Sequence, residues 1–126
     1  TAHMSFAKWW VPAAELDDGE SEIWSVLANH SVSAWRAVGG KLVATQSRLV
    51  FTPNRIDRAL NGRVWAVPLD SIKAVDRKGP TGGLFNGGLR SRMRIVTNDG
   101  TEHLFVVNKL NDIISKTEAH LAQRLA

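Results

Sequence analysis

The stretch Gly39–Phe51, GGKLVATQSRLVF, predicts the fold more directly than any other part of the chain. Side chains of a strand alternate between two faces, so a two-residue connection at Gln46 and Ser47 sets one register for its flanks. The expected pairs are Ala44 with Leu49 and Leu42 with Phe51 on one face, and Val43 with Val50 on the other. A slip by one residue would exchange the two hydrophobic rows. The pattern therefore specifies a hairpin, although neither turn residue is Gly or Asn.

Length and composition are those of one globular domain. The 126 residues are 44% hydrophobic and 22% charged, with a net charge of +4 and no cysteine. The fold must therefore be stabilised by packing without disulfides, which suits a reducing cytoplasm. No apolar run approaches the ~20 residues that span a bilayer. The basic balance favours anionic partners, either lipid head groups or nucleic acid.

The chain is expected to divide into three parts. Residues 1–4 look like a cloning remnant and a start methionine, residues 5–20 form an N-terminal lead-in, and residues 21–126 form the domain. In the lead-in, Trp9 and Trp10 are either an interfacial anchor or a cover for an open sheet edge. The acidic run Glu15–Glu22 has no calcium-loop spacing and is predicted to be a solvated linker.

Further strands are predicted from period-two patterns and breakers. They are Ile23–Ala28, the two strands of the hairpin closed by Pro53-Asn54, Val64–Leu69 and Ser71–Asp76, with connections at His30–Val38, Arg55–Gly62 and Gly79–Gly88. A second hairpin is centred on Asp99-Gly100, a type I′ turn signal. The expected pairs there are Ile95 with Leu104 and Met93 with Val106 on the buried face, and Arg94 with Phe105 and Arg92 with Val107 on the other.

A C-terminal amphipathic helix completes the predicted architecture. Its apolar stripe comprises Leu110, Ile113, Ile114, Thr117, Leu121 and Leu125. Asn108 is expected to be the N-cap. About seven strands and one helix that covers them predict a mainly β fold, a small antiparallel barrel or sandwich capped by the helix.

Three segments resemble a bacterial GRAM domain, a branch of the pleckstrin-homology (PH) superfold: GGKLVATQSRLVFTP, WAVPLDSIKAV and RMRIVTNDGTEHLFVVN. The resemblance covers roughly Glu20–Leu121. It implies a non-catalytic module that brings proteins to membranes or to other proteins. Gln46 stands where the family's hairpin turn usually carries Asn or Asp.

Basic residues gather in the connections after the first and third strands. In an antiparallel meander these connections lie at the same end of the sheet, which in PH domains is the usual ligand mouth. The residues are Arg36, Lys41, Arg55, Arg58 and Arg63, opposed by Asp57. Arginine forks suit phosphate, so these cations form a candidate site for an anionic head group. The alternative is that they are ordinary solvated loop charges, which are more common.

The glycine-rich loop Arg77–Arg90 is a second candidate. Leu84 and Phe85 form its apolar tip, between Arg77 and Lys78 on one side and Arg90 on the other. An apolar tip with a basic collar can enter an anionic bilayer, or it can fold back and cap the barrel. The glycines lack the Lys-Ser/Thr of a nucleotide loop.

The row Arg90, Arg92 and Arg94 beside Phe105 gives a weaker alternative, the binding of single-stranded nucleic acid. The other interpretation of this row is a solvated outer face with a cation–π contact. His30, His103 and His120 lie in unrelated elements without a nucleophile or carboxylate at a recognisable spacing. His103 is expected on the outer row of its strand. No catalytic site, metal site or cofactor is predicted. The expected partner is anionic lipid or another protein, in the cytoplasm or peripherally at a membrane.

Overall fold

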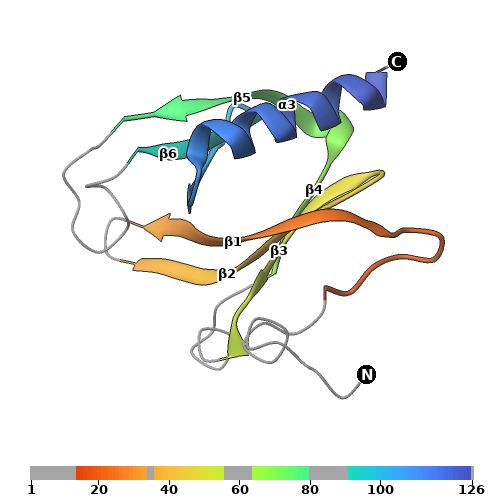
Figure 1. Cartoon of the computed structure of the whole chain (residues 1–126), viewed down its shortest axis with the longest axis horizontal. Coiled ribbons are helices and arrows are strands. Elements are labelled where there is room, and N and C mark those ends of the chain that lie inside the picture. Colours follow the sequence, from red (N-terminus) through yellow and green to blue (C-terminus); the bar gives the residue numbers. More distant parts are fainter. Residues whose placement is uncertain (1–13, 34–35, 56–63, 80–90, 126) are drawn as a thin grey trace.

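The computed structural model describes residues 14–33, 36–55, 64–79 and 91–125, and Figure 1 shows their arrangement. The elements are β1 (Glu22–Ser33), β2 (Arg36–Thr45), β3 (Arg48–Pro53), β4 (Trp65–Pro68), a 3₁₀ turn η1 (Leu69–Ser71), β5 (Ile72–Lys78), β6 (Arg92–Thr97), β7 (Glu102–Val107) and the helix α3 (Leu110–Leu125). Seven strands and one C-terminal helix confirm the predicted fold class.

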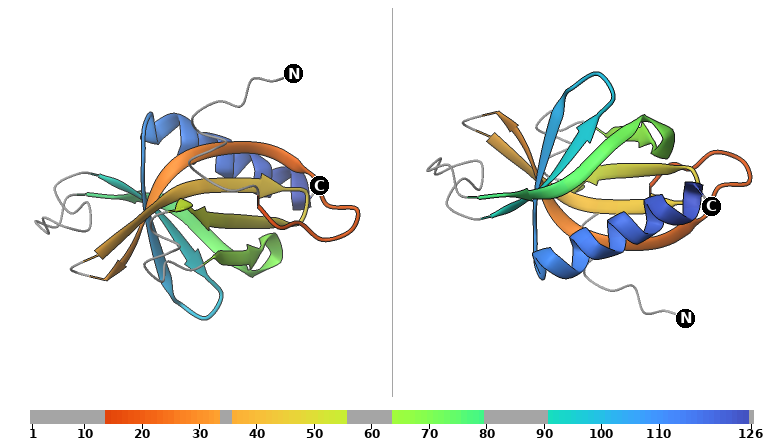
Figure 2. Two further views of the ribbon diagram at one scale, coloured as in Figure 1. Left: turned by 90° about the horizontal axis from the view of Figure 1, so that it is seen from below. Right: turned by 90° about the horizontal axis from the view of Figure 1, so that it is seen from above.

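The seven strands form one antiparallel sheet in the order β4-β3-β2-β1-β7-β6-β5. Strands that follow each other in the sequence pair with each other, except β4 and β5, which η1 separates. In addition, β1 pairs with β7. Among the described strands, β4 and β5 are therefore the two edges of the sheet. The sheet curls around the core without closing, as the two views in Figure 2 show.

The first hairpin has the register predicted from the sequence. Its pairs include Leu42 with Phe51, Val43 with Val50 and Ala44 with Leu49. All six side chains are at most 1% exposed, so both faces of the hairpin are buried. Because the hairpin buries a hydrophobic row on each of its two faces, the sequence pattern specifies the register even without a strong turn sequence.

The lead-in holds the turn of this hairpin. The Gln46 side chain donates to the carbonyl of Gly19 and accepts from the N–H of Ser21. The Glu20 carboxylate accepts two hydrogen bonds from the Arg48 guanidinium, at 2.6 and 2.9 Å, and one from Thr45. The Glu20 side chain is only 3% exposed. The prediction of a solvated linker is therefore wrong at this residue, whose pKa is lowered mainly by the Arg48 hydrogen bonds.

The second hairpin turns at the predicted place in another register. Met93 pairs with Phe105, Arg94 with Leu104 and Ile95 with His103, one position from the expected pairs. Thr97 and Thr101 close a three-residue loop, with the Thr97 N–H donating to the Thr101 carbonyl. Gly100 has φ 84°, the left-handed conformation that ends a type I turn in such loops. The extra loop residue shifts β7, so that His103 and Phe105 face the interior.

Two predicted boundaries also differ. The strand predicted to end at Ala28 continues to Ser33, so part of the expected connection His30–Val38 is paired β-structure. Trp35, expected in that connection, lies outside the described residues. The helix begins at Leu110, and its first hydrogen bond runs from the Ile113 N–H to the Lys109 carbonyl. Lys109, with φ 53°, therefore occupies the N-cap position predicted for Asn108.

The core lies between the concave face of the sheet and α3. Leu49 and Ile95 are fully buried, and Ile113 and Ile114 of the helix belong to the same cluster. Figure 1 shows α3 lying along β5 and β6. Farther along the helix, the His120 ring hydrogen-bonds with the Thr45 carbonyl of β2 and meets Trp24 of β1 edge-on at 6.2 Å. The helix therefore covers the sheet, as its apolar stripe predicted.

Candidate functional site

Two strands, β1 and β3, end at the same end of the sheet, which we call the connection end. Because neighbouring strands are antiparallel, β1 and β3 run toward this end, and β2 and β4 start from it. Strand β5 is separated from β1 by β7 and β6, so its pairing sets it opposite to β1, although the arrowheads of β1 and β5 lie on the same side in Figure 1. The first basic cluster singled out in the sequence follows the ends of β1 and β3.

The first predicted cluster is described only in part. Arg55 is exposed two residues after the end of β3, whereas Arg58 and Arg63 lie outside the described residues, as does the side chain of Arg36 at the start of β2. Lys41 does not belong to the connection end. It lies in the middle of β2, between Leu27 and Thr52 of the adjacent strands, with its Nζ 3.8 Å from the Glu22 carboxylate. The sequence prediction placed it too near the loop because the first strand pair is longer than expected.

The second predicted cluster contributes two described cations. Arg77 donates to the side chains of Asn111 and Ser91, at 2.9 and 3.1 Å. Lys78 forms an ion pair of 2.6 Å with Glu102. The predicted apolar tip, Leu84 and Phe85, and Arg90 lie outside the described residues.

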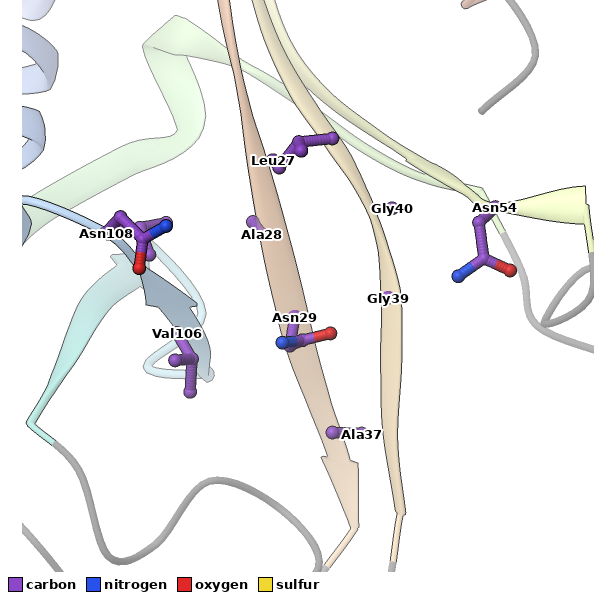
Figure 3. A pocket seen from close by; sticks show the side chains of 10 residues that line it. Leu27, Ala28, Asn29, Ala37, Gly39, Gly40, Asn54, Val106 and Asn108 are labelled. Carbon is purple, nitrogen blue, oxygen red and sulfur yellow. The ribbon is translucent and has the colours of Figure 1, made fainter. Parts of the chain in front are cut away.

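A pocket of about 390 Å³ opens beside β1 near the connection end (Figure 3). Gly39 and Gly40 of β2 carry no side chains and so leave space at the floor of the pocket. Asn29, Asn54 and Asn108 contribute its amide groups, and Leu27 and Val106 its apolar walls. Arg55 and Lys109, both exposed, directly follow two of these asparagines in the chain. The sequence did not indicate this pocket, because its residues come from three strands, β1, β2 and β7, and from the positions after β3 and β7, at no recognisable spacing.

The arginine row does not form the solvated cationic face that the nucleic-acid alternative requires. Arg92 is 1% exposed. Arg94 is held by two hydrogen bonds to Asp76, at 2.6 and 2.7 Å, and this carboxylate raises its pKa. Phe105, expected beside these arginines, is fully buried in the core. Arg90 lies outside the described residues.

Two histidines lie among aromatic rings on the concave face, which the sequence analysis missed. The His30 ring stacks on Phe105 at 4.6 Å and contacts Phe51 and Trp65. Burial, with a smaller effect of the nearby His103, lowers the pKa of His30 to about 4. Burial also lowers the pKa of His103, which is half-buried rather than on an outer row. The register shift of β7 accounts for that error.

Within the described ranges, no three His, Asp or Glu side chains are grouped as metal ligands would be. The one helix described there is unsuited to crossing a bilayer, by its length and its polarity.

Comparisons with known proteins bear on the fold. No protein-family model and no curated protein matches the sequence. Among solved structures, the C-terminal domain of an unknown protein from Leishmania infantum has a TM-score of 0.63 at 16% identity, over 82% of this chain and 86% of that one. The Vps36 N-terminal PH domain has a TM-score of 0.59 at 18% identity, over 88% and 86%. At these identities the likeness is one of fold, and this chain has a PH-like fold.

Proposed function

We propose that this protein is a non-catalytic, GRAM-like binding module that contacts anionic membrane lipid through the connection end of its sheet. The PH-like fold supports a binding module, since one of its structural neighbours is a PH domain. The resemblance of its hairpin sequences to GRAM domains supports the same class. Anionic lipid is proposed as the ligand because basic residues are concentrated in a few of the segments that connect the strands.

The segments that join β1 to β2, β3 to β4 and β5 to β6, with their flanks, are strongly basic. They contain Arg36, Arg55, Arg58, Arg63, Arg77, Lys78 and Arg90, and a single acid, Asp57. The whole chain has a net charge of only +4, so the remainder carries net negative charge. A molecule polarised in this way orients its basic end toward an anionic surface, and each cation near that surface contributes about 1 kcal/mol.

The pocket beside β1 adds directional groups at the same end. Asparagine side chains donate hydrogen bonds to phosphate oxygens, and Asn29 and Asn108 are exposed on its walls. Arg55 and Lys109 are close by in the chain and supply charge. This combination favours a phosphate-bearing head group over a neutral lipid.

Co-sedimentation with phosphatidylserine-containing vesicles tests the proposal. Arg55→Glu should weaken binding by roughly ten- to thirtyfold, because it changes the charge near the surface by two units. Lys73→Glu is the matched control, since Lys73 is an exposed cation near the start of β5, at the opposite end of that strand. Binding should also decrease as salt is raised. Equal losses in the two variants, or no binding at low salt, would refute a lipid site at this end.

A protein partner is the second candidate, favoured by exposed apolar side chains on β1. Ile23 and Leu27 of this strand are 54% and 55% exposed. Exposed large apolar groups are typical of contact surfaces. If they hold two copies together, light scattering will give a dimer mass for the wild type and a monomer mass for Leu27→Asp. A monomeric wild type at high concentration would exclude self-association through this face.

A further inference from the structure

The structure has a second hollow, beside edge strand β4. It has a volume of about 410 Å³ and opens between edge strand β4, the 3₁₀ turn η1 and the β6–β7 turn. Its lining residues are Trp65, Ala66, Val67, Ser71, Thr97, Asn98, Asp99 and His103. The hollow exists because β4 does not pair with β5 in the described sheet, so the barrel is open between them.

One wall of the hollow is aromatic and rigid. The rings of Trp65 and His103 lie 4.9 Å apart between centroids. Behind them, Phe105 and His30 lie 5.3 and 5.8 Å from Trp65. Burial lowers the pKa of His103, so this ring is uncharged at neutral pH. A neutral aromatic wall that is packed from behind offers a fixed π-face to a cation.

The facing wall carries negative charge. The Asp99 carboxylate accepts hydrogen bonds from the Thr97 hydroxyl and the Thr101 N–H. These hydrogen bonds lower the pKa of Asp99 to about 2, so it is ionised at neutral pH. Asp70, on η1, is exposed and immediately precedes the lining residue Ser71.

The acidic wall is held in place by bonds between the two turns that form it. The Asn98 N–H donates to the Ser71 carbonyl at 2.8 Å, and the Asn98 side chain donates to the Asp70 carbonyl at 3.0 Å. The β6–β7 turn and η1 are therefore fixed to each other. The hollow keeps its shape without a ligand, which reduces the ordering cost of binding.

We propose that this hollow receives a basic side chain, Arg or Lys, from a partner protein. A guanidinium or ammonium group lies favourably against an aromatic face and beside a carboxylate, and the hydroxyls of Ser71 and Thr97 accept its remaining hydrogen bonds. Asp99 and Asp70 repel an anionic ligand. This inference is independent of the lipid proposal.

NMR titration of the full ¹⁵N-labelled chain tests the site. The probes are N-acetyl-arginine amide and its citrulline analogue, which has the same shape without the charge. The arginine probe should shift the indole N–H of Trp65 and the amides of Asn98, Asp99 and His103, in a dissociation range on the order of 1 mM for a single side chain. The citrulline probe should shift them at least fivefold less. Equal shifts from the two probes, or shifts confined to the connection end, would overturn the proposal.

Two variants separate the site from general charge effects. Asp99→Asn keeps an acceptor for the Thr97 and Thr101 bonds but removes the charge, and should weaken the arginine probe at least fivefold. Asp112→Asn, an equal charge change at an exposed site on the first turn of α3, should leave it unchanged. Trp65→Phe keeps a ring and should weaken binding less than Asp99→Asn. Equal weakening by Asp99→Asn and Asp112→Asn would contradict the assignment. Shifts of the same amides that depend on protein concentration in the absence of a probe would also contradict it, because they would mean that a second copy of the chain occupies the hollow.

Discussion

Acidification should destabilise this fold through His30, and the size of the effect follows from its surroundings. The imidazole stacks on Phe105 at 4.6 Å within the aromatic cluster, and its pKa is lowered to about 4 from an ordinary 6.5. The unfolded chain therefore takes up a proton at a higher pH than the folded chain. The contribution of His30 to stability is fully present above pH 6.5 and is lost as pH falls through about 4.

The expected magnitude is large enough to measure. The whole shift corresponds to about 3 kcal/mol below pH 4, and linkage gives a loss of about 1.3 kcal/mol between pH 7.5 and pH 5.5. His103 titrates in the same direction, since its pKa is also lowered, so the wild type alone does not isolate His30. The informative quantity is the difference in pH slope between the wild type and His30→Leu, which cannot take up that proton.

Urea denaturation followed by tryptophan fluorescence, at several values between pH 7.5 and pH 5.5, gives this difference. The wild type should lose about 1 kcal/mol more than His30→Leu over this range, whatever the two stabilities are at pH 7.5. The variant should keep a smaller slope, contributed by His103. Parallel pH profiles for the two proteins would refute the reasoning, because they would mean that His30 is solvated in the folded state.

Two further predictions concern the first hairpin and its lead-in. Gly40→Ala should lower the free energy of unfolding by about 1–3 kcal/mol, because the added Cβ would overlap the carbonyl oxygen of Thr52. Gly79→Ala is the control, since no atom lies near its added Cβ, and crowding should not destabilise it; equal losses in urea denaturation would contradict the prediction. Glu20→Gln should lower the free energy of unfolding by about 1–3 kcal/mol, because it removes the carboxylate that accepts the Arg48 hydrogen bonds. Because the pKa of Glu20 is lowered in the folded state, the variant should also lose less stability than the wild type as pH falls below 4.5. Identical acid denaturation of the two proteins by circular dichroism would show that the carboxylate is not coupled to folding.

The two hairpins show what a sequence pattern can specify. In the first, apolar residues on both faces allow one register only, and the pairing of Leu42 with Phe51 was predictable. In the second, Asp99-Gly100 fits both a two-residue type I′ turn and a three-residue loop that ends at a left-handed Gly100. The flanking β7 has apolar residues at consecutive positions, so either register buries some of them. Only the loop length decides, and the sequence does not encode it unambiguously.

The candidate sites were less predictable than the fold. A charge seen in the sequence carries no information about its partner. Arg94 pairs with Asp76 of the adjacent strand β5, and Lys78 of β5 pairs with Glu102 of β7, two strands away. The aromatic hollow depended on the correct position of His103 and was missed together with that register. The pocket beside β1 combines residues from three strands and from the positions that follow β3 and β7, which no local spacing reveals. Long-range placement, rather than residue type, was the missing information.

The pairing of β1 with β7 joins two halves of the sheet, and it differs from every other strand pair in how far apart its strands lie in the sequence. Only four residue pairs, Ala28–Ser31 with Leu104–Val107, hydrogen-bond strands β1–β4 to strands β5–β7. Every other strand pair joins neighbours in sequence and closes a short loop. The joint instead closes a loop of more than seventy residues, at an entropic cost that grows with loop length. Local meanders should therefore form early and their union late, so this joint is expected to limit the folding rate and to exchange its amide protons sooner than the first hairpin.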